Sequence, residues 1–135
     1  MNIHPSKKID VNGELVDIDV EIIPLIKLMN DIPGVFTTFC CQGNKSIKRP
    51  YIHPYVAFCC KSKKSIHLIQ KAVDKTKFTY LINWVSTNDD YVPKNCLKSQ
   101  CYSLEFDDQK CKNKFYKNLK FIVGAGKPPS PCGRV

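Results

Sequence analysis

The residue types best suited to bind a ligand gather in one short segment, TTFCCQGNK at residues 37–45. Its glycine, Gly43, allows close backbone approach or a positive φ, and successive backbone N–H groups in such a turn can form an anion-binding nest. Polar and positively charged side chains surround this glycine: Thr38, Gln42, Asn44, Lys45, Lys48 and Arg49. Because backbone donors and positive charge this close together suit a phosphate group, we predict a nucleotide or another phosphate-bearing ligand at this turn. A solvated, inert connection between two strands is the alternative.

Cys41 belongs to the same predicted ligand site and is also the candidate nucleophile. A nucleophilic thiol needs a lowered pKa and a base beside it. His53 is the base expected nearest to it, since the strand-like runs 35–41 and 51–60 are expected to pair. Glu105, in the middle of another strand-like run, is the carboxylate expected to face a pocket. Catalysis also requires hydrogen-bond geometry, so a strand-edge position for His53 and an edge-strand position for Glu105 stay the alternatives.

Aromatic side chains could cover a bound base by stacking on it. Trp84, within the alternating run at residues 77–86, is the candidate that we single out for this role, with a tyrosine as the substitute. The tyrosines are otherwise expected mostly in the core, because alternate residues of a strand pack against helices. They are Tyr51, Tyr55, Tyr80 and Tyr102.

The net charge of +9 is spread unevenly along the 135 residues. The first 35 residues carry a net charge of −3 and the rest carry +12, so the body of the protein attracts phosphate-bearing partners. Of the 21 basic residues 19 are lysine, which lacks the planar fork with which arginine reads bases or grips phosphate. We therefore expect general attraction to anions rather than sequence-specific recognition of DNA. A solvated surface rich in lysine is the alternative.

Eight cysteines are spread over the chain: Cys40, Cys41, Cys59, Cys60, Cys96, Cys101, Cys111 and Cys132. The N-terminus lacks the apolar stretch of a secretory signal, so we expect a cytoplasmic protein whose thiols mostly stay reduced. The two adjacent pairs lie in apolar runs, which predicts buried thiols. Structural zinc sites usually show closely spaced pairs such as C-x₂-C, and no such pair occurs in this sequence, so no metal site is predicted. Whether Cys96, Cys101 and Cys111 bind a metal stays open.

Hydrophobic periodicity predicts the elements that position these residues. Asn12-Gly13 is a strong two-residue turn signal and predicts a hairpin over residues 8–19. Asp19 is expected to cap a helix that runs to Asn30, and Ser62 is expected to cap the next helix. The remaining elements follow in this order: strands 35–41 and 51–60, helix 63–74, strands 77–86 and 100–106, and a helix from Asp107 or Asp108 to Gly124.

These elements predict an α+β fold in which a helix–strand–strand unit occurs twice, with the hairpin before the two units and a helix after them. Paired strands with short links bury one face against amphipathic helices, so we expect a mostly antiparallel or mixed four-stranded sheet with helices on one face. The length fits one domain, which we place at residues 1–127, followed by a flexible Pro-rich tail at 128–135. No stretch approaches the roughly 18 apolar residues of a membrane span, so no membrane association is expected.

The run DIDVEIIPLIKLMNDIPGVFTTFCCQG at residues 17–43, with PYVAF at 54–58, resembles the opening of small proteins that carry a Ser/Cys–Gly turn. It is similar to the family of the tRNA wybutosine-synthesising methyltransferase, the third enzyme of its pathway. The turn of that family reads Ser-Ser-Cys-Ser-Gly-Arg, and the matching stretch here is FCCQGN, so Cys41 and Gly43 agree while the hydroxyls and the Arg are replaced. The resemblance covers about residues 17–58 and implies a shared fold, a ligand site at this turn and a link to RNA. With the hydroxyls and the Arg replaced, no S-adenosylmethionine or other cofactor is predicted.

Four functions stay open at this point. The first is binding, or sequestration, of a small nucleotide or phosphate-bearing metabolite without catalysis; a compact chain rich in Lys, Asn and Ile would suit a viral protein that acts on a host nucleotide signal. The second is an RNA-binding or tRNA-modifying protein, as the resemblance implies. The third is a Cys-dependent enzyme or a nucleotide hydrolase, and the fourth is a protein–protein inhibitor without a small-ligand site. Self-association into an oligomer is compatible with each of them.

Overall fold

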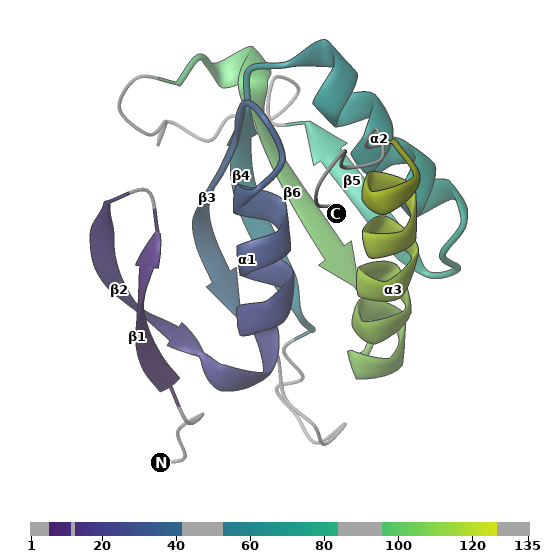
Figure 1. Cartoon of the computed structure of the whole chain (residues 1–135). Helices are drawn as coiled ribbons and strands as arrows, with labels where there is room; N and C mark the ends of the chain where they lie inside the picture. Colours follow the sequence, from purple (N-terminus) through teal and green to yellow (C-terminus); the bar gives the residue numbers. More distant parts are fainter. Residues whose placement is uncertain (1–5, 12, 42–52, 84–95, 127–135) are drawn as a thin grey trace, which may run out of the picture.

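The computed structural model describes residues 6–11, 13–41, 53–83 and 96–126 (Figure 1). Within these ranges it contains a two-stranded hairpin, a four-stranded sheet and three α-helices. The strands are β1 (Ser6–Val11), β2 (Glu14–Asp19), β3 (Val35–Cys41), β4 (Tyr55–Cys60), β5 (Thr79–Asn83) and β6 (Cys101–Phe106). The helices are α1 (Ile23–Asn30), α2 (Lys63–Asp74) and α3 (Gln109–Gly126), with short 3₁₀ helices η1 (Val20–Ile22) and η3 (Lys98–Gln100).

The large sheet has the strand order β3-β4-β6-β5, and each neighbouring pair is antiparallel. The three α-helices lie over one face of this sheet, as Figure 1 shows, and the hairpin β1-β2 lies beside β3. The predicted α+β class is therefore confirmed, and so are the two helix–strand–strand units. Among the described residues, no helix combines the length and the apolar character that crossing a membrane requires. The Pro-rich tail at residues 128–135 lies outside the described residues and stays a prediction.

The hairpin forms where the Asn-Gly signal predicted it. Gly13 has a φ of +89°, a left-handed conformation that glycine adopts without a steric penalty, and its N–H donates to Asp10 Oδ1 at 2.9 Å. Ile9 and Ile18, one from each strand, are buried in the main core. The hairpin thus closes one edge of the apolar core under α1.

The first helix differs from the prediction at its start. The regular α-helix begins at Ile23 rather than after Asp19, because η1 comes first, and the Asp19 side chain makes no capping hydrogen bond to η1. Pro24 explains the boundary: its fixed φ suits the first helical turn, but it has no N–H to donate further inside a helix. Pro54 likewise explains why β4 begins at Tyr55 and not at residue 51 as predicted. Proline has no N–H to donate to the hydrogen bonds between strands.

The two helix–strand–strand units form a structural repeat. In the first unit, Lys61 N–H donates to Gly34 O at 2.9 Å, and in the second, Asp107 N–H donates to Phe78 O at 3.1 Å. Gly34 has a φ of +80° and Phe78 a φ of +57°, so both turns use a left-handed residue between helix and strand. Because the inner strands β4 and β6 are antiparallel neighbours, the units are related by an approximate twofold rotation through the centre of the sheet. The sequence shows the repeated pattern of elements but no repeated residues.

A side-chain cap begins each of the two later helices. Ser62 Oγ accepts from Ser65 N–H at 3.2 Å at the start of α2, as predicted. Of the two aspartates proposed for α3, Asp108 is the cap, since its Oδ1 accepts from Cys111 N–H at 2.9 Å. This hydrogen bond from the Cys111 backbone is the main cause that lowers the pKa of Asp108.

Replacing Asp108 by alanine should lower the free energy of unfolding by about 1 kcal/mol, the usual value of an N-cap. Asp108→Asn keeps the acceptor oxygen and should lose less. Because the folded-state pKa of Asp108 is depressed, its charge stabilises the protein above about pH 4, and this contribution disappears as the pH falls through the folded pKa. Urea unfolding at pH 7 and pH 3 measures both effects. A wild-type difference between the two pH values that Asp108→Asn leaves unreduced would contradict the assignment.

The core lies between the helices and the sheet. Its largest fully buried side chains include Phe58, Phe106, Phe115, Leu104 and Leu119. The rings of Phe106 and Phe115 are tilted against each other with their centroids 5.4 Å apart, which joins β6 to α3. Leu104 and Phe106 therefore face the helices, and Glu105, which lies between them on β6, faces the opposite side of the sheet.

Candidate functional site

The sheet face turned away from the α-helices, which we call the outer face, carries the candidate site. Four residues form one row across this sheet, since Tyr55 pairs with Cys41 on one side and with Glu105 on the other, and Glu105 also pairs with Tyr80. Directly opposed residues of an antiparallel sheet project to the same face. We call these four positions the Glu105 row. It lies where β3 and β6 end and where β4 and β5 begin.

The outer face is partly open, so the prediction that the tyrosines mostly lie in the core is wrong for Tyr80. It holds for Tyr102, which packs against the core and stacks on Phe58. Tyr80 is 47% exposed and Ile82 is 37% exposed, whereas Thr79, on the face of β5 that is turned to the helices, is buried. The alternation of β5 was predicted, but the helices cover its less aromatic side. Partial desolvation, with the Asp107 carboxylate as a further cause, raises the pKa of Tyr80. A side-chain hydrogen bond with Asp107 contributes to the same shift.

The centre of the site is a contact between His53 and Glu105. His53 Nε2 lies 3.1 Å from Glu105 Oε1, and Ser103 Oγ donates to Glu105 Oε2 at 3.5 Å, at the limit of hydrogen bonding. Both side chains of the His53–Glu105 pair remain partly exposed, at 45% and 34%. Glu105 lies on β6, between β4 and β5, so the edge-strand alternative for this residue is wrong. His53 lies two residues before the start of β4, beside Pro54, and its imidazole contacts Glu105 on the neighbouring strand β6.

This arrangement can orient an imidazole and present hydrogen-bonding groups to a ligand. A neutral His53 that donates from Nε2 to the carboxylate keeps Nδ1 as an acceptor. Ser103 contacts the carboxylate instead of the imidazole. In a Ser–His–Asp hydrolase the histidine lies between the other two groups, so the three residues do not reproduce that order. The geometry thus favours recognition of a ligand over nucleophilic catalysis by Ser103.

The predicted phosphate-binding residues are related to this site by chain connectivity. The segment between Cys41 and His53 leaves the sheet at the Glu105 row and returns to it there. Thr38 lies half-buried at the β-bulge between Thr37 and Phe39. The other predicted residues of this segment lie outside the described residues: Gln42, Gly43, Asn44, Lys45, Lys48 and Arg49. The backbone of Cys41 is in the row, whereas its side chain lies outside the description, so the Cys41–His53 pair stays a prediction.

Trp84, the aromatic residue predicted to cover a ligand, lies outside the described residues, so its role stays a prediction. Tyr80, by contrast, pairs directly with Glu105. The substitute role of a tyrosine therefore has a structural basis in this row.

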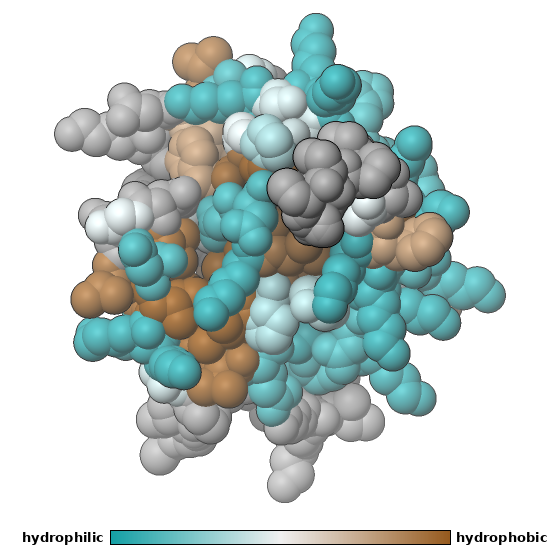
Figure 2. Space-filling model, viewed as in Figure 1, coloured by the Kyte–Doolittle hydropathy of each residue, from teal (hydrophilic) through white to brown (hydrophobic). Residues whose placement is uncertain are grey.

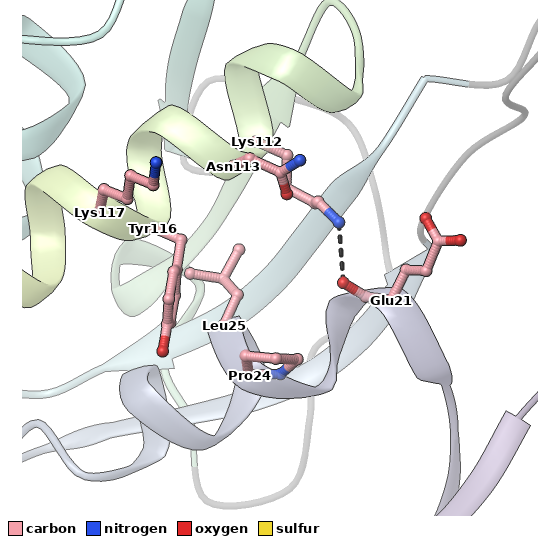
Figure 3. Close-up of a pocket in the computed structure, with 7 residues that line it drawn as sticks. All are labelled: Glu21, Pro24, Leu25, Lys112, Asn113, Tyr116 and Lys117. Carbon is pink, nitrogen blue, oxygen red and sulfur yellow. Dashed lines mark hydrogen bonds between the residues drawn. The ribbon is translucent and has the colours of Figure 1, made fainter.

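A concave region lies on the helix side, between η1, α1 and α3 (Figure 3). This cavity of about 350 Å³ is lined by Glu21, Pro24, Leu25, Lys112, Asn113, Tyr116 and Lys117. Lys112 is only 3% exposed, and its Nζ donates to Glu21 O at 2.8 Å. The Glu21 carboxylate points away from this ammonium group in Figure 3. The contact ties η1 to α3, which gives Lys112 a structural role.

Sequence reasoning missed Lys112, although a signal for it existed. Four other lysines of α3 are exposed, namely Lys110, Lys114, Lys117 and Lys120. Lys112, however, lies three positions before Phe115 and seven before Leu119, which are fully buried. This spacing places it on the buried face of the helix. A charge on an apolar stripe indicates a lysine whose ammonium group must find a buried partner.

The cysteines differ in part from the expectation of reduced thiols. Cys59 and Cys96 form a disulfide, which the sequence did not reveal. Cys40, Cys60, Cys101 and Cys111 are not disulfide-bonded, while Cys132 and the side chain of Cys41 lie outside the description. Burial raises the pKa of Cys60 and of Cys111, so neither is a reactive thiolate at neutral pH.

Comparison of the chain with protein-family models, with curated proteins and with solved structures finds no match in any of the three. The resemblance of residues 17–58 to the wybutosine methyltransferase family therefore stays a prediction.

Proposed function

We propose that the protein binds a small nucleotide or a similar phosphate-bearing metabolite at the Glu105 row. The observation that carries this proposal is the His53–Glu105 contact at 3.1 Å. It lies where the basic segment 42–52 leaves the sheet and returns to it, between Cys41 and His53. One end of the sheet thus carries a hydrogen-bond acceptor, the Glu105 carboxylate, and the His53 imidazole. The basic residues of segment 42–52 are connected to the same end along the chain.

The charges suggest how such a ligand would be oriented. A carboxylate repels phosphate, so the phosphate group would lie toward the lysines and the arginine of segment 42–52. The Glu105 carboxylate would then accept hydrogen bonds from an amino group of the base or a hydroxyl of the sugar. Tyr80, half-exposed in the same row, offers a ring on which a base can stack. His53, held by Glu105, offers a second hydrogen bond beside it.

Binding rather than turnover is proposed because the described residues supply no activated nucleophile in contact with His53. Its partner is a carboxylate, and a base that serves a nucleophile must lie within hydrogen-bond reach of it. Sequestration of a nucleotide signal would need no more than this. The viral context that the composition suggests belongs to this proposal.

Calorimetric titration with ATP and with cyclic AMP tests the proposed site. Glu105→Gln and Arg49→Ala should each weaken binding roughly tenfold or more, as expected for loss of a hydrogen bond to a charged group, about 1.5–3 kcal/mol. Affinity should also fall as salt is raised, because lysine–phosphate contacts are screened. The matched control is Lys117→Ala, which removes one positive charge from the α1–α3 cavity and should bind as the wild type does.

Wild-type affinity in Glu105→Gln combined with Arg49→Ala would show that the Glu105 row is not the site. Weakened binding in Lys117→Ala alone would move the ligand to the cavity of Figure 3. Circular dichroism of each variant verifies that the fold is intact, since all three substitutions are at exposed or half-exposed positions or in segment 42–52.

RNA binding is the second candidate function, and the lysine row of α3 favours it. Lys110, Lys114, Lys117 and Lys120 are all exposed on this helix. Figure 2 shows hydrophilic residues gathered over α2 and α3, while hydrophobic residues gather toward the hairpin and α1. A row of ammonium groups attracts a phosphate backbone without reading its sequence. Fluorescence anisotropy with a labelled single-stranded RNA, in wild type and in Lys114→Ala with Lys117→Ala, separates this function from nucleotide binding.

A further inference from the structure

Three cysteine sulfurs meet at the end of the outer face opposite to the Glu105 row. Cys59 on β4 and Cys101 on β6 are directly paired in the sheet, and Cys96 precedes η3. Cys59 and Cys96 form the disulfide, and the Sγ of Cys101 lies 3.4 Å from the Sγ of Cys96. All three are at most 9% exposed and form a small core cluster against which Phe36 packs. A thiol in contact with a disulfide is the starting arrangement of thiol–disulfide exchange.

We propose that Cys59, Cys96 and Cys101 form an intramolecular thiol–disulfide exchange site. The Cys101 thiol loses its proton, and its thiolate attacks Cys96 Sγ. A Cys96–Cys101 bond forms as the Cys59–Cys96 bond breaks, and Cys59 leaves as a thiolate that takes up a proton. One disulfide and one thiol are present before and after, so the step needs no oxidant or reductant.

The neighbouring backbone positions the three sulfur atoms close to one another. The Leu97 carbonyl accepts from the Cys101 thiol at 3.4 Å and lies 3.6 Å from Cys96 Sγ. Cys59 and Cys101 are held by the ladder between the two central strands, so only Cys96 has to change its partner. Burial keeps external thiols away from the disulfide, so the attacking group in this proposal is the Cys101 sulfur, which already contacts Cys96 Sγ.

The two disulfide isomers constrain different parts of the chain. The Cys59–Cys96 bond closes a sequence separation of 37 residues, which includes α2 and β5. A Cys96–Cys101 bond closes a separation of five, which includes only η3. Exchange would therefore free the α2–β5 segment from its covalent link to β4. Since a disulfide stabilises more when it closes a longer loop, the exchanged isomer should be the less stable one toward unfolding.

Disulfide mapping tests the proposal. Full-length protein purified without reductant is incubated at pH 8, quenched with acid, alkylated with N-ethylmaleimide in denaturant and digested with trypsin. Cleavage after Lys98 separates Cys96 from Cys101, so a bond between them appears as two linked peptides, and fragmentation distinguishes Cys59 from Cys60. We expect both linkages in wild type. Cys59→Ser, reoxidised with oxidised glutathione, should carry only Cys96–Cys101, and Cys101→Ser only Cys59–Cys96.

Cys111→Ser is the matched control, since it removes a thiol on α3 outside this cluster and should keep both linkages of the wild type. Wild-type protein that holds only Cys59–Cys96 after prolonged incubation would overturn the proposal. So would folded, reoxidised Cys59→Ser in which Cys96 and Cys101 are both alkylated. The wild-type measurement does not depend on any variant, so a folding defect in Cys59→Ser leaves the test intact.

Discussion

Replacing Phe106 by alanine should lower the free energy of unfolding by about 3–5 kcal/mol, the usual cost of removing a buried phenylalanine. Replacing Tyr80 by alanine should cost less than about 1 kcal/mol, because the cost of losing a side chain follows its burial. Phe106 is fully buried and packs on Phe115, whereas Tyr80 is half-exposed on the neighbouring strand. The two aromatic residues project to opposite faces of the sheet. Urea unfolding of both variants measures the difference.

The comparison of Phe106→Ala with Tyr80→Ala tests whether the outer face of the sheet is open. The proposed ligand binding requires that it is. A loss for Tyr80→Ala as large as that for Phe106→Ala would mean that the outer face is packed. The Glu105 row would then not be accessible to a ligand. Phe106→Leu, which keeps an apolar side chain in the same place, should retain more of the stability than Phe106→Ala.

Replacing Gly34 by alanine should lower the free energy of unfolding by roughly 2–4 kcal/mol. Two effects add at this position. Its φ of +80° is unfavourable for any residue with a Cβ, and an added Cβ would lie 2.9 Å from Ser62 Cβ, a contact that requires the backbone to move. Ser62 caps α2, so the shift would also disturb the start of that helix. Thermal or urea unfolding followed by circular dichroism gives the loss.

The equivalent turn of the second unit provides the control. Phe78 holds a φ of +57° without being glycine, and its side chain is 59% exposed. Phe78→Gly should therefore be more stable than Phe78→Ala by about 1 kcal/mol, since glycine alone escapes the left-handed penalty. Equal stabilities of the two Phe78 variants, together with a small loss for Gly34→Ala, would contradict a left-handed residue at both turns.

The functional consequence of the repeat is that the outer face has two chemically different ends. Glu105 on β6 and Cys59 on β4 immediately precede the last residues of their strands and occupy equivalent places in the two units. One end carries the His53–Glu105 contact, and the other carries the three-sulfur cluster. Our two proposals therefore concern opposite ends of this face, ligand binding at the Glu105 row and thiol–disulfide exchange at the sulfur cluster. The calorimetric and mapping experiments address these ends independently.

The sequence by itself determined the local elements. The Asn12-Gly13 signal, the Ser62 cap and the apolar stripes predicted the hairpin and the helices because turns, caps and helical periodicity depend on residues a few positions apart. The bounds of β3 and α2 agree with the prediction residue for residue. The helix was predicted to start after Asp19, but η1 comes first and α1 begins at Ile23, with Pro24 in its first turn.

Only the tertiary structure decided which residues meet. His53 and Glu105 are 52 positions apart, and Cys59 and Cys96 are 37 apart, so their contacts depend on the order and register of strands that pair across the sheet. The alternating side chains of β5 show that the strand has two faces, but not which of them the helices cover. Pairing with β6 decides this, because Leu104 and Phe106 of β6 pack under the helices. Tyr80 is consequently turned outward beside Glu105, where a local pattern alone would have placed it in the core. Strand register is a long-range property, and shifting it by one residue reverses every side chain.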